Sequence, residues 1–277
     1  MTDTQLRRER AERPDTPRAA YARLSAPVRA RVIAALLAVA AAGWAYTVRE
    51  ADGMSGMVMG LGQVGEMAMT MAVPSFLGMW AAMMVAMMSP TVAPVALAHR
   101  GAAGQGRRRA VSTAAFVVGF LLVWTATGVV AFGAYRLILE IPVDAANSRW
   151  LPAVAGAVLV GVGALQLTPW KMHCLEACRR PVAAAGGTDA TAGVAASFGT
   201  GLVHGWRCLG CCWALMVVLL VVGVMNLAWM AVIAAIFLLD KHWSRAVGLT
   251  RLVGALFIVL GLAVIAFPDA LAFISGV

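Results

Sequence analysis

One short stretch of the chain concentrates side chains that can bind a soft metal ion. Three cysteines fall within five residues of the run His204-Gly-Trp-Arg-Cys208-Leu-Gly-Cys211-Cys212-Trp-Ala-Leu-Met216. On an α-helix, residues three and four apart share a face, so the imidazole, the thiols and the thioether would form one stripe. Thiolate and thioether ligands favour Cu(I), and Cys/His sets also suit Zn. The stretch therefore predicts a metal or redox site.

A second pair of cysteines lies in His173-Cys174-Leu-Glu-Ala-Cys178-Arg-Arg. Cys174 and Cys178 are four residues apart and would share a helical face. Cations stand beside the thiols in both motifs, and a neighbouring cation favours the thiolate form that metal binding and thiol exchange need. The two motifs could form one joint site or two separate ones. A single buried cysteine is also an ordinary apolar residue of a membrane helix, and that alternative stays open.

Methionine is the third candidate ligand type. Eleven of the 16 methionines lie between Met54 and Met88. Two stripes with i, i+4 spacing run through the apolar segment 75–98, and the candidate ligands in them are Met83, Met84, Met87 and Met88. The segment 54–72 adds MxxM and MxM spacings. Thioether sulfur is uncharged and polarisable, so it can bind Cu(I) and release it again. Methionine also fills irregular gaps between helices, which is the alternative explanation.

The composition indicates that membrane helices position these residues. The 277 residues are 61 % hydrophobic and 13 % charged, whereas a soluble domain has about 25 % charged residues. We expect an all-α, polytopic transmembrane helical bundle. The seven candidate spans are 32–48, 75–98, 110–135, 150–168, 203–224, 226–240 and 250–267. Residues Met225-Asn226 separate the fifth candidate span from the sixth, and we interpret them as a tight hairpin. If the two segments instead formed one long helix, the protein would have six spans.

The distribution of basic residues predicts the orientation of the bundle. Nineteen of the 22 basic residues fall on the side of the N-terminus, and only Arg49, Arg136 and Arg149 fall on the other. Cytoplasmic segments carry the excess of Lys and Arg, so the N-terminus, both cysteine motifs and all four histidines are expected to be cytoplasmic. The same rule explains the net charge of +9 without nucleic acid. Residues 1–30 are predicted to be a disordered basic tail, and residues 31–277 the membrane domain.

The end of the sixth candidate span and the ratio of arginine to lysine have simple explanations. The run Asp240-Lys241-His242 ends the sixth candidate span and is expected to be an interfacial anchor. Arginine outnumbers lysine 20 to 2, which we attribute to the base composition of the genome. The sequence has no Walker loop, GxSxG or Rossmann glycine pattern, so an enzyme is not favoured.

These motifs resemble a bacterial family catalogued as a domain of unknown function and described as predicted metal-binding integral membrane proteins. The resemblance covers the chain from about Trp80 onward, and Leu165 departs from the aromatic residue that the family usually shows there. It rests on Ala86-Met87-Met88-Ser89-Pro90, Gln166-Leu-Thr-Pro-Trp-Lys171, Cys174, Cys178-Arg179, Pro181 and the run Cys208 to Met216. The resemblance implies a helical membrane protein whose cysteines bind metal, and leaves the reaction open.

The sequence thus predicts a multi-pass protein of the bacterial plasma membrane that binds a soft transition metal for handling or delivery. Copper as Cu(I) is favoured over zinc. The predicted ligands are Cys174, Cys178, Cys208, Cys211, Cys212, His173, His204, Met83, Met84, Met87, Met88 and Met216. The expected partners are the lipid bilayer, the ion and a metallochaperone or membrane complex. Two alternatives are a thiol–disulfide oxidoreductase that exchanges Cys174/Cys178 with Cys208/Cys211, and an accessory subunit of a membrane complex.

Overall fold

The computed structural model describes residues 24–53, 72–102, 107–140, 150–179, 193–223, 226–242 and 246–271. Within these ranges the secondary structure is helical and no strand occurs, which confirms the all-α prediction. The helices are α3 (Ala26–Gly53), α4 (Val73–Ala102), α5 (Arg107–Leu139), α7 (Trp150–Leu167), α8 (Pro169–Arg179), α9 (Val194–Val222), α10 (Leu227–His242) and α11 (Ala246–Ala266). Most of the basic tail (1–23) and nearly all of the Met-rich segment 54–72 lie outside the described residues.

Six helices of the described chain are long and apolar enough to cross a membrane: α3, α4, α5, α7, α9 and α11. The helix α10 is apolar but has only 16 residues, whereas a span needs about 20. A break separates α9 from α10, since Gly223 ends α9 at a φ of 110° that favours glycine. The Asn226 side-chain oxygen then accepts a hydrogen bond from the Trp229 N–H at 3.1 Å and caps α10. The single long helix is therefore wrong, and the expected separation at this point is confirmed.

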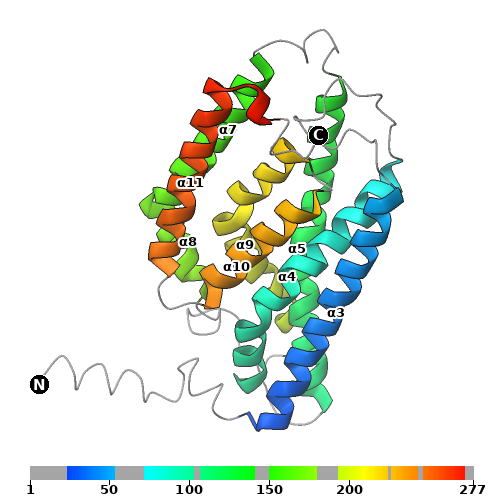
Figure 1. Ribbon diagram of the computed structural model, residues 1–277. Helices are drawn as coiled ribbons and strands as arrows, with labels where there is room; N and C mark the ends of the chain where they lie inside the picture. Colours follow the sequence, from blue (N-terminus) through cyan, green and yellow to red (C-terminus); the bar gives the residue numbers. More distant parts are fainter. Residues whose placement is uncertain are drawn as a thin grey trace, which may run out of the picture.

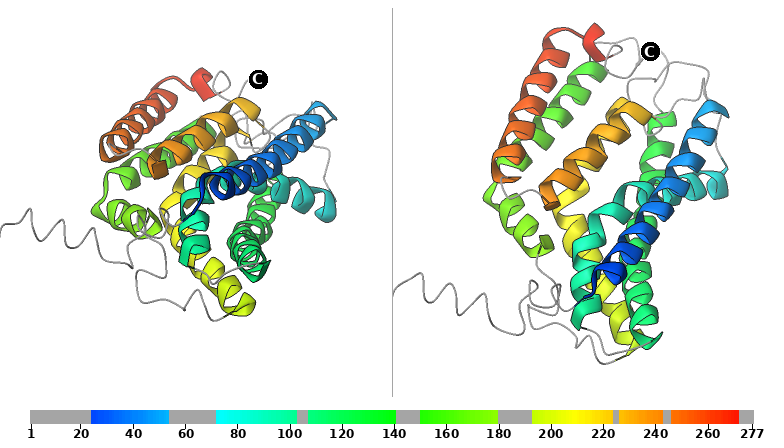
Figure 2. Two further views of the ribbon diagram at one scale, coloured as in Figure 1. Left: turned by 90° about the horizontal axis from the view of Figure 1, so that it is seen from below. Right: turned by 60° about the horizontal axis from the view of Figure 1, so that its bottom comes forward.

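The helices form one bundle with α9 and α10 in its middle (Figure 1). The pair α7 and α11 lies on one side, and α3, α4 and α5 lie on the other, as the view from below also shows (Figure 2). Among the membrane-length helices, α4 and α9 have the largest buried share and α3 the smallest. In Figure 1, α8 and the end of α10 lie at the lower end of the side formed by α7 and α11, α3 begins at the foot of the picture, and α11 ends near its top. The methionine stripes of α4 and the cysteines 208–212 of α9 therefore lie on the two most enclosed of the membrane-length helices.

Glycines allow the long helices to approach one another closely. A Cβ atom added at Gly201 of α9 would lie 2.1 Å from the Phe116 backbone oxygen of α5, and one at Gly119 of α5 would lie 2.4 Å from the Phe198 oxygen. Gly156 of α7 and Gly261 of α11 approach each other's backbones in the same way. Small residues are typical of packed membrane helices, where close van der Waals contact stabilises association. This packing fixes the position of α9 and hence of its cysteines.

The close approach at Gly201 can be tested by adding a single methyl group. We expect Gly201→Ala to lower the stability of the bundle by about 1–3 kcal/mol, because the new Cβ must displace the α5 backbone. The matched control is Gly199→Ala on the same helix, where an added Cβ meets no atom within 4 Å. Thermal unfolding of both variants in detergent measures the difference. Equal unfolding midpoints would contradict the packing described here.

Candidate metal centre

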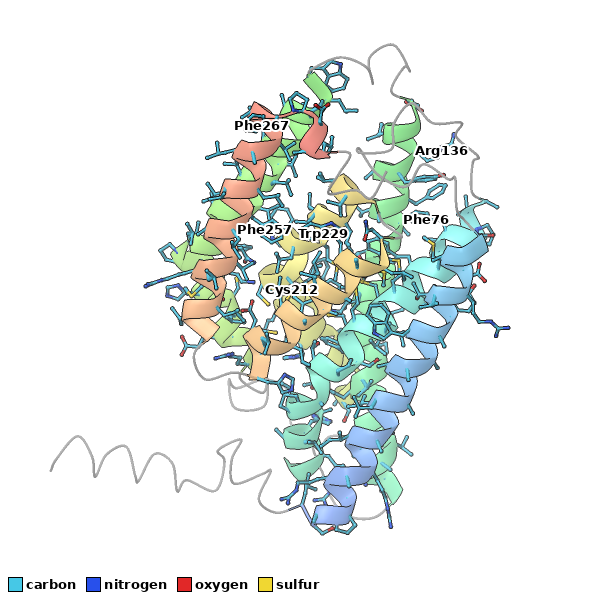
Figure 3. The ribbon with its side chains drawn as sticks, in the orientation of Figure 1. Phe76, Arg136, Cys212, Trp229, Phe257 and Phe267 are labelled. Atoms are coloured by element: carbon cyan, nitrogen blue, oxygen red, sulfur yellow. The ribbon has the colours of Figure 1, made fainter. Side chains whose placement is uncertain are left out.

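The helix α9 carries the cysteine-rich motif on its buried face. The residues buried along it include His204, Cys208, Cys211, Cys212 and Met216, which repeat at intervals of three and four as the predicted stripe requires. Cys208 is 0 % exposed, and Cys211 and Cys212 are each 2 % exposed. Figure 3 shows Cys212 deep inside the bundle. The helical stripe expected from the sequence is therefore present.

The short helix α8 brings a fourth cysteine to this face. Thr168 caps it, since its Oγ1 accepts a hydrogen bond from the Lys171 N–H at 3.3 Å, and Pro169 occupies the first helical position, where a missing N–H costs nothing. The buried residues of α8 are Lys171, Leu175 and Cys178, which follow the spacing of one helical face. This face points Cys178 towards α9.

The sulfur atoms of four cysteines adjoin one another. The side chain of Cys178 lies close to those of Cys208 and Cys211, and that of Cys208 lies close to that of Cys212, all within one buried core. The Sγ atoms of Cys211 and Cys212 are 3.2 Å apart. The interaction with Cys208 holds the pKa of the Cys178 thiol well above its ordinary value. We call Cys178, Cys208, Cys211 and Cys212 the thiol cluster.

An ammonium group lies directly against the thiol cluster. Lys241, near the end of α10, places Nζ 2.9 Å from Cys208 Sγ and 3.1 Å from Thr91 Oγ1 of α4. The same Nζ lies 6.0 Å from the centre of the Phe120 ring. An ammonium donates to sulfur and to a hydroxyl oxygen, so Lys241 ties α10 to α9 and α4 at this point. The expectation that Asp240-Lys241-His242 is only an interfacial anchor is wrong for Lys241, because its ammonium points inward.

The expectation is also wrong for Asp240, which forms a buried ion pair beside the cluster. Its Oδ2 is 3.5 Å from Lys171 Nζ, and both side chains are 3 % exposed. Lys171 Nζ also donates to the Cys211 backbone oxygen at 2.6 Å, and Thr250 Oγ1 donates to Asp240 Oδ1 at 3.0 Å. Arg179 donates from Nε and Nη2 to the Asp240 backbone oxygen. Of the three anchor residues only His242 is exposed, with Nδ1 2.9 Å from the Leu238 oxygen.

The methionine stripes of α4 are buried in the core next to this site. Met83, Met84, Met87 and Met88 are each 0–1 % exposed. Thr91 Oγ1, which contacts Lys241, lies 3.8 Å from Met88 Sδ. Met84, Met88 and Thr91 repeat at intervals of four and three, so they lie on one face of α4. A stripe of thioethers therefore leads along α4 to the residue that touches the thiol cluster through Lys241.

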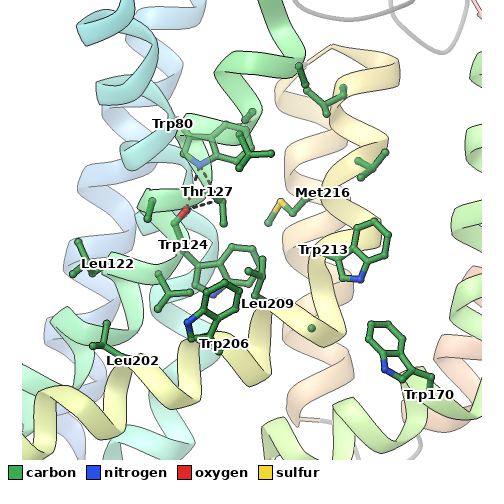
Figure 4. A pocket seen from close by; sticks show the side chains of 18 residues that line it. Trp80, Leu122, Trp124, Thr127, Trp170, Leu202, Trp206, Leu209, Trp213 and Met216 are labelled. Atoms are coloured by element: carbon green, nitrogen blue, oxygen red, sulfur yellow. Dashed lines mark hydrogen bonds between the residues drawn. The ribbon is translucent and has the colours of Figure 1, made fainter. Parts of the chain in front are cut away.

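Besides the α4 methionines and His204, three predicted ligands lie outside the thiol cluster. Cys174 is half-buried on α8, beside the buried stripe of that helix, and its Sγ lies near Gly210 of α9; burial raises the pKa of its thiol. His173 is exposed, with Nδ1 2.8 Å from the Pro169 oxygen. Met216 lines an apolar groove of about 790 Å³ between α5 and α9. Figure 4 shows it there beside Trp213, with Trp80 and Trp124 across the groove.

His204 stands one helical turn before Cys208 and is packed between aromatic rings. Its ring centre is 5.8 Å from that of Phe116 and 5.6 Å from that of Phe120. The residue is 2 % exposed, and among the described residues its Nδ1 has no hydrogen-bond partner. A buried imidazole nitrogen without a hydrogen-bond partner is unusual. Depending on its tautomer, His204 Nδ1 offers either a lone pair or an N–H donor one helical turn from Cys208.

The described residues contain no group of three or more His, Cys, Asp and Glu side chains already arranged to hold a metal ion. Within the cluster, Cys211 Sγ donates to the Cys208 backbone oxygen at 3.1 Å, and Lys241 Nζ donates to Cys208 Sγ. Two of the thiols are thus engaged by hydrogen bonds. Their chemistry nevertheless fits a soft ion, because four sulfur donors lie within reach of one another.

Comparison with known proteins supplies the family. The family described as PpoB2, copper chaperone, matches residues 77–264. The chain belongs to the PpoB2 copper chaperone family. This match covers α8, α9 and α10 in full, and with them every residue of the thiol cluster. It agrees with the resemblance to a metal-related membrane family. No curated protein and no solved structure matches the chain.

Sequence reasoning missed the polar partners of the cluster in this PpoB2 family member. Lys171, Lys241, Asp240 and Thr91 are absent from the ligands predicted above. One signal was available: the chain has only two lysines against 20 arginines, and both of them contact a cysteine residue of the cluster. Both lysines therefore mark this site.

The buried ion pair beside the cluster predicts a marked asymmetry between single and double variants. We expect Lys171→Met alone to destabilise the protein by about 3–5 kcal/mol, because the buried Asp240 carboxylate loses the ammonium that lies 3.5 Å from it. The double variant Lys171→Met/Asp240→Asn removes both charges and should be clearly more stable than the single one. Chemical unfolding in detergent gives both free energies. A double variant no more stable than Lys171→Met would contradict this description of the pair.

Proposed function

We propose that this chain binds Cu(I) inside the membrane and hands it on, with the thiol cluster as its holding site. The observation that carries the proposal is the convergence of four cysteine sulfurs from α8 and α9 in the bundle interior. Soft sulfur ligands select Cu(I) over harder ions. The copper chaperone family to which the chain belongs supports the same conclusion. The bilayer in question is taken to be the bacterial plasma membrane, with the cluster nearer its cytoplasmic side.

The holding site uses thiols that adjoin one another before an ion arrives. Loading replaces the contacts among Cys178, Cys208, Cys211 and Cys212 by sulfur–copper bonds. Each thiol that binds must lose its proton, so loading releases protons. His204, whose buried Nδ1 has no partner among the described residues, is a further donor one turn away.

The α4 stripe is the proposed route to the cluster. Thioethers bind Cu(I) without charge and therefore more weakly than thiolates do, which suits a relay. Met84 and Met88 share a face with Thr91, and Thr91 contacts Lys241 beside Cys208. Pro90 and Pro94 lie inside the same helix, where proline leaves backbone carbonyls without an intrahelical partner. The methionines of segment 54–71, outside the described residues, are the proposed collectors.

The positions of the cysteines give less support to the two alternative functions, a thiol–disulfide oxidoreductase and an accessory subunit. A thiol–disulfide exchange between the pairs Cys174/Cys178 and Cys208/Cys211 needs Cys174 in the cluster, and Cys174 lies beside it near Gly210. The role of an accessory subunit with inert cysteines does not account for an ammonium group placed 2.9 Å from a buried thiol. We therefore retain copper binding as the leading function.

Metal binding by the purified full-length chain tests the proposal. We expect about one Cu(I) per chain under anaerobic conditions, measured by competition with a chromophoric Cu(I) chelator, because the cluster offers one set of converging thiolates. The triple variant Cys208→Ser/Cys211→Ser/Cys212→Ser should lose this copper. Cys174→Ser, which removes the thiol outside the cluster, is the matched control and should keep it.

Two results would overturn copper binding at the cluster. One is that the wild type and the triple variant carry the same sub-stoichiometric copper. The other is that copper remains in the triple variant but is lost in Cys174→Ser. X-ray absorption at the copper edge of the loaded wild type provides an independent measurement, since the proposal requires sulfur neighbours.

The relay makes a kinetic prediction that is separate from the affinity. We expect Met84→Leu/Met88→Leu to slow the loading of the cluster from added Cu(I) by about tenfold, since apolar leucine offers no ligand. The final copper content should not change. Leucine conserves volume, so the core should tolerate the change. Met230→Leu, a buried methionine of α10, is the control, and equal loading rates in all three proteins would exclude the relay.

A further inference from the structure

The only two lysines of the chain occupy different electrostatic situations beside the thiol cluster. Lys171 has a carboxylate partner, because Asp240 Oδ2 lies 3.5 Å from its Nζ. Among the described residues, the Lys241 ammonium contacts the Cys208 sulfur, the Thr91 hydroxyl and the Phe120 ring. The cluster therefore has one cation paired with a carboxylate and one cation that lies directly against a cysteine sulfur of the cluster itself.

The ammonium of Lys241 is also close to any ion that the cluster holds. Its Nζ is 2.9 Å from Cys208 Sγ, and a bond from thiolate sulfur to such a metal ion is about 2.3 Å long. An ion bonded to Cys208 therefore lies within about 5 Å of this positive charge while Lys241 keeps its contact. In a buried site the two charges interact strongly, because little water screens them.

The repulsion between the Lys241 ammonium and a bound ion depends on the charge of that ion. Repulsion between Lys241 and a divalent ion is twice that between Lys241 and a monovalent ion at the same place. Cu(I) and Zn(II) have the same filled d shell, and so do Ag(I) and Cd(II). All four bind thiolate sulfur, so charge is the main property by which the members of each pair differ at a fixed set of ligands.

We propose that Lys241 is a specificity-determining residue, whose fixed positive charge beside Cys208 makes the thiol cluster prefer monovalent over divalent soft ions. The inference rests on the proposed copper-binding function and deepens it. Sulfur alone would accept Zn(II) as readily as many structural zinc sites do. Lys241 adds the discrimination that a copper carrier needs in the presence of zinc.

The test measures the affinities of the full-length chain for Ag(I) and Cd(II) by competition in detergent. In Lys241→Met the ratio of the two affinities should shift by about tenfold to a hundredfold towards Cd(II), because the extra repulsion on the divalent ion is gone. Both affinities can fall together if the cluster is disturbed in general, but such a loss leaves their ratio unchanged. The ratio therefore isolates the effect of charge.

Three further variants separate charge from structure. Lys241→Arg keeps the positive charge and should keep the wild-type ratio. Lys241→Gln removes the charge but retains a donor for Thr91, and should shift the ratio as Lys241→Met does. Arg251→Met removes an exposed cation of α11 and should leave the ratio unchanged, because water screens that charge.

A last variant keeps Lys241 in place and therefore does not depend on how the neutral variants fold. In Thr91→Asp the new carboxylate faces the ammonium and cancels its charge, so the ratio should again shift towards Cd(II). The inference fails if the wild type binds Ag(I) but no folded neutral variant changes the ratio. It also fails if Lys241→Arg shifts the ratio as strongly as Lys241→Met. A wild type that binds neither Ag(I) nor Cu(I) overturns the proposed function itself, and the two failures are thus distinct.

Discussion

Positive charge inside a bundle of membrane helices is the constraint on which the arrangement around the cysteines depends. Cations in such a setting are costly and occur where a partner or a function holds them. Here Lys171 and Lys241 enter the same region from α8 and α10. Their partners come from α9, α10 and α4, so four helices meet where these charges must be satisfied. Because each ammonium group needs specific acceptors, these contacts fix how far each of the four helices can slide or rotate relative to the others.

The apolar part of the bundle complements this polar centre. In lipid, helices gain little from burying apolar side chains, and close backbone contact supplies much of the stability instead. The glycine contacts between α5 and α9 provide it near the start of α9, and those between α7 and α11 provide it at the side. As a result α9 is enclosed along the face that carries its cysteines, while the side that carries Trp206 and Trp213, together with Met216, lines the tryptophan-rich groove. The protein thus separates its thiols from the side of α9 on which Trp206 and Trp213 are exposed.

Much of the fold follows from the sequence because hydropathy and helical spacing are local signals. Apolar runs of sufficient length predict the helices, and the spacing of His204, Cys208 and Cys211 is enough to place them on one helical face. The cap at Asn226 is equally local, since an asparagine side chain accepts from the N–H three residues on. By contrast, Cys174 and Cys178 are equivalent by spacing, yet only Cys178 belongs to the thiol cluster. Which of two such positions points inward depends on the helix opposite, and spacing alone does not contain that information.

The partners of the thiols are harder to find because they are defined by tertiary contact alone. Asp240 and Lys241 stand at the end of an apolar helix, where a charged pair normally faces the membrane surface. They turn inward here, where α8 contacts α10 and Arg179 of α8 donates to the Asp240 backbone oxygen. The last carbonyls of a helix have no intrahelical partner, so they accept from cations of a neighbouring element. The same logic applies to Lys171, which donates to the Cys211 oxygen at a distance of 40 residues along the chain. The cation–carbonyl bonds that hold α8 against α9 and α10 therefore also deliver Cys178 to the other three thiols, and the docking of one short polar helix completes the sulfur set.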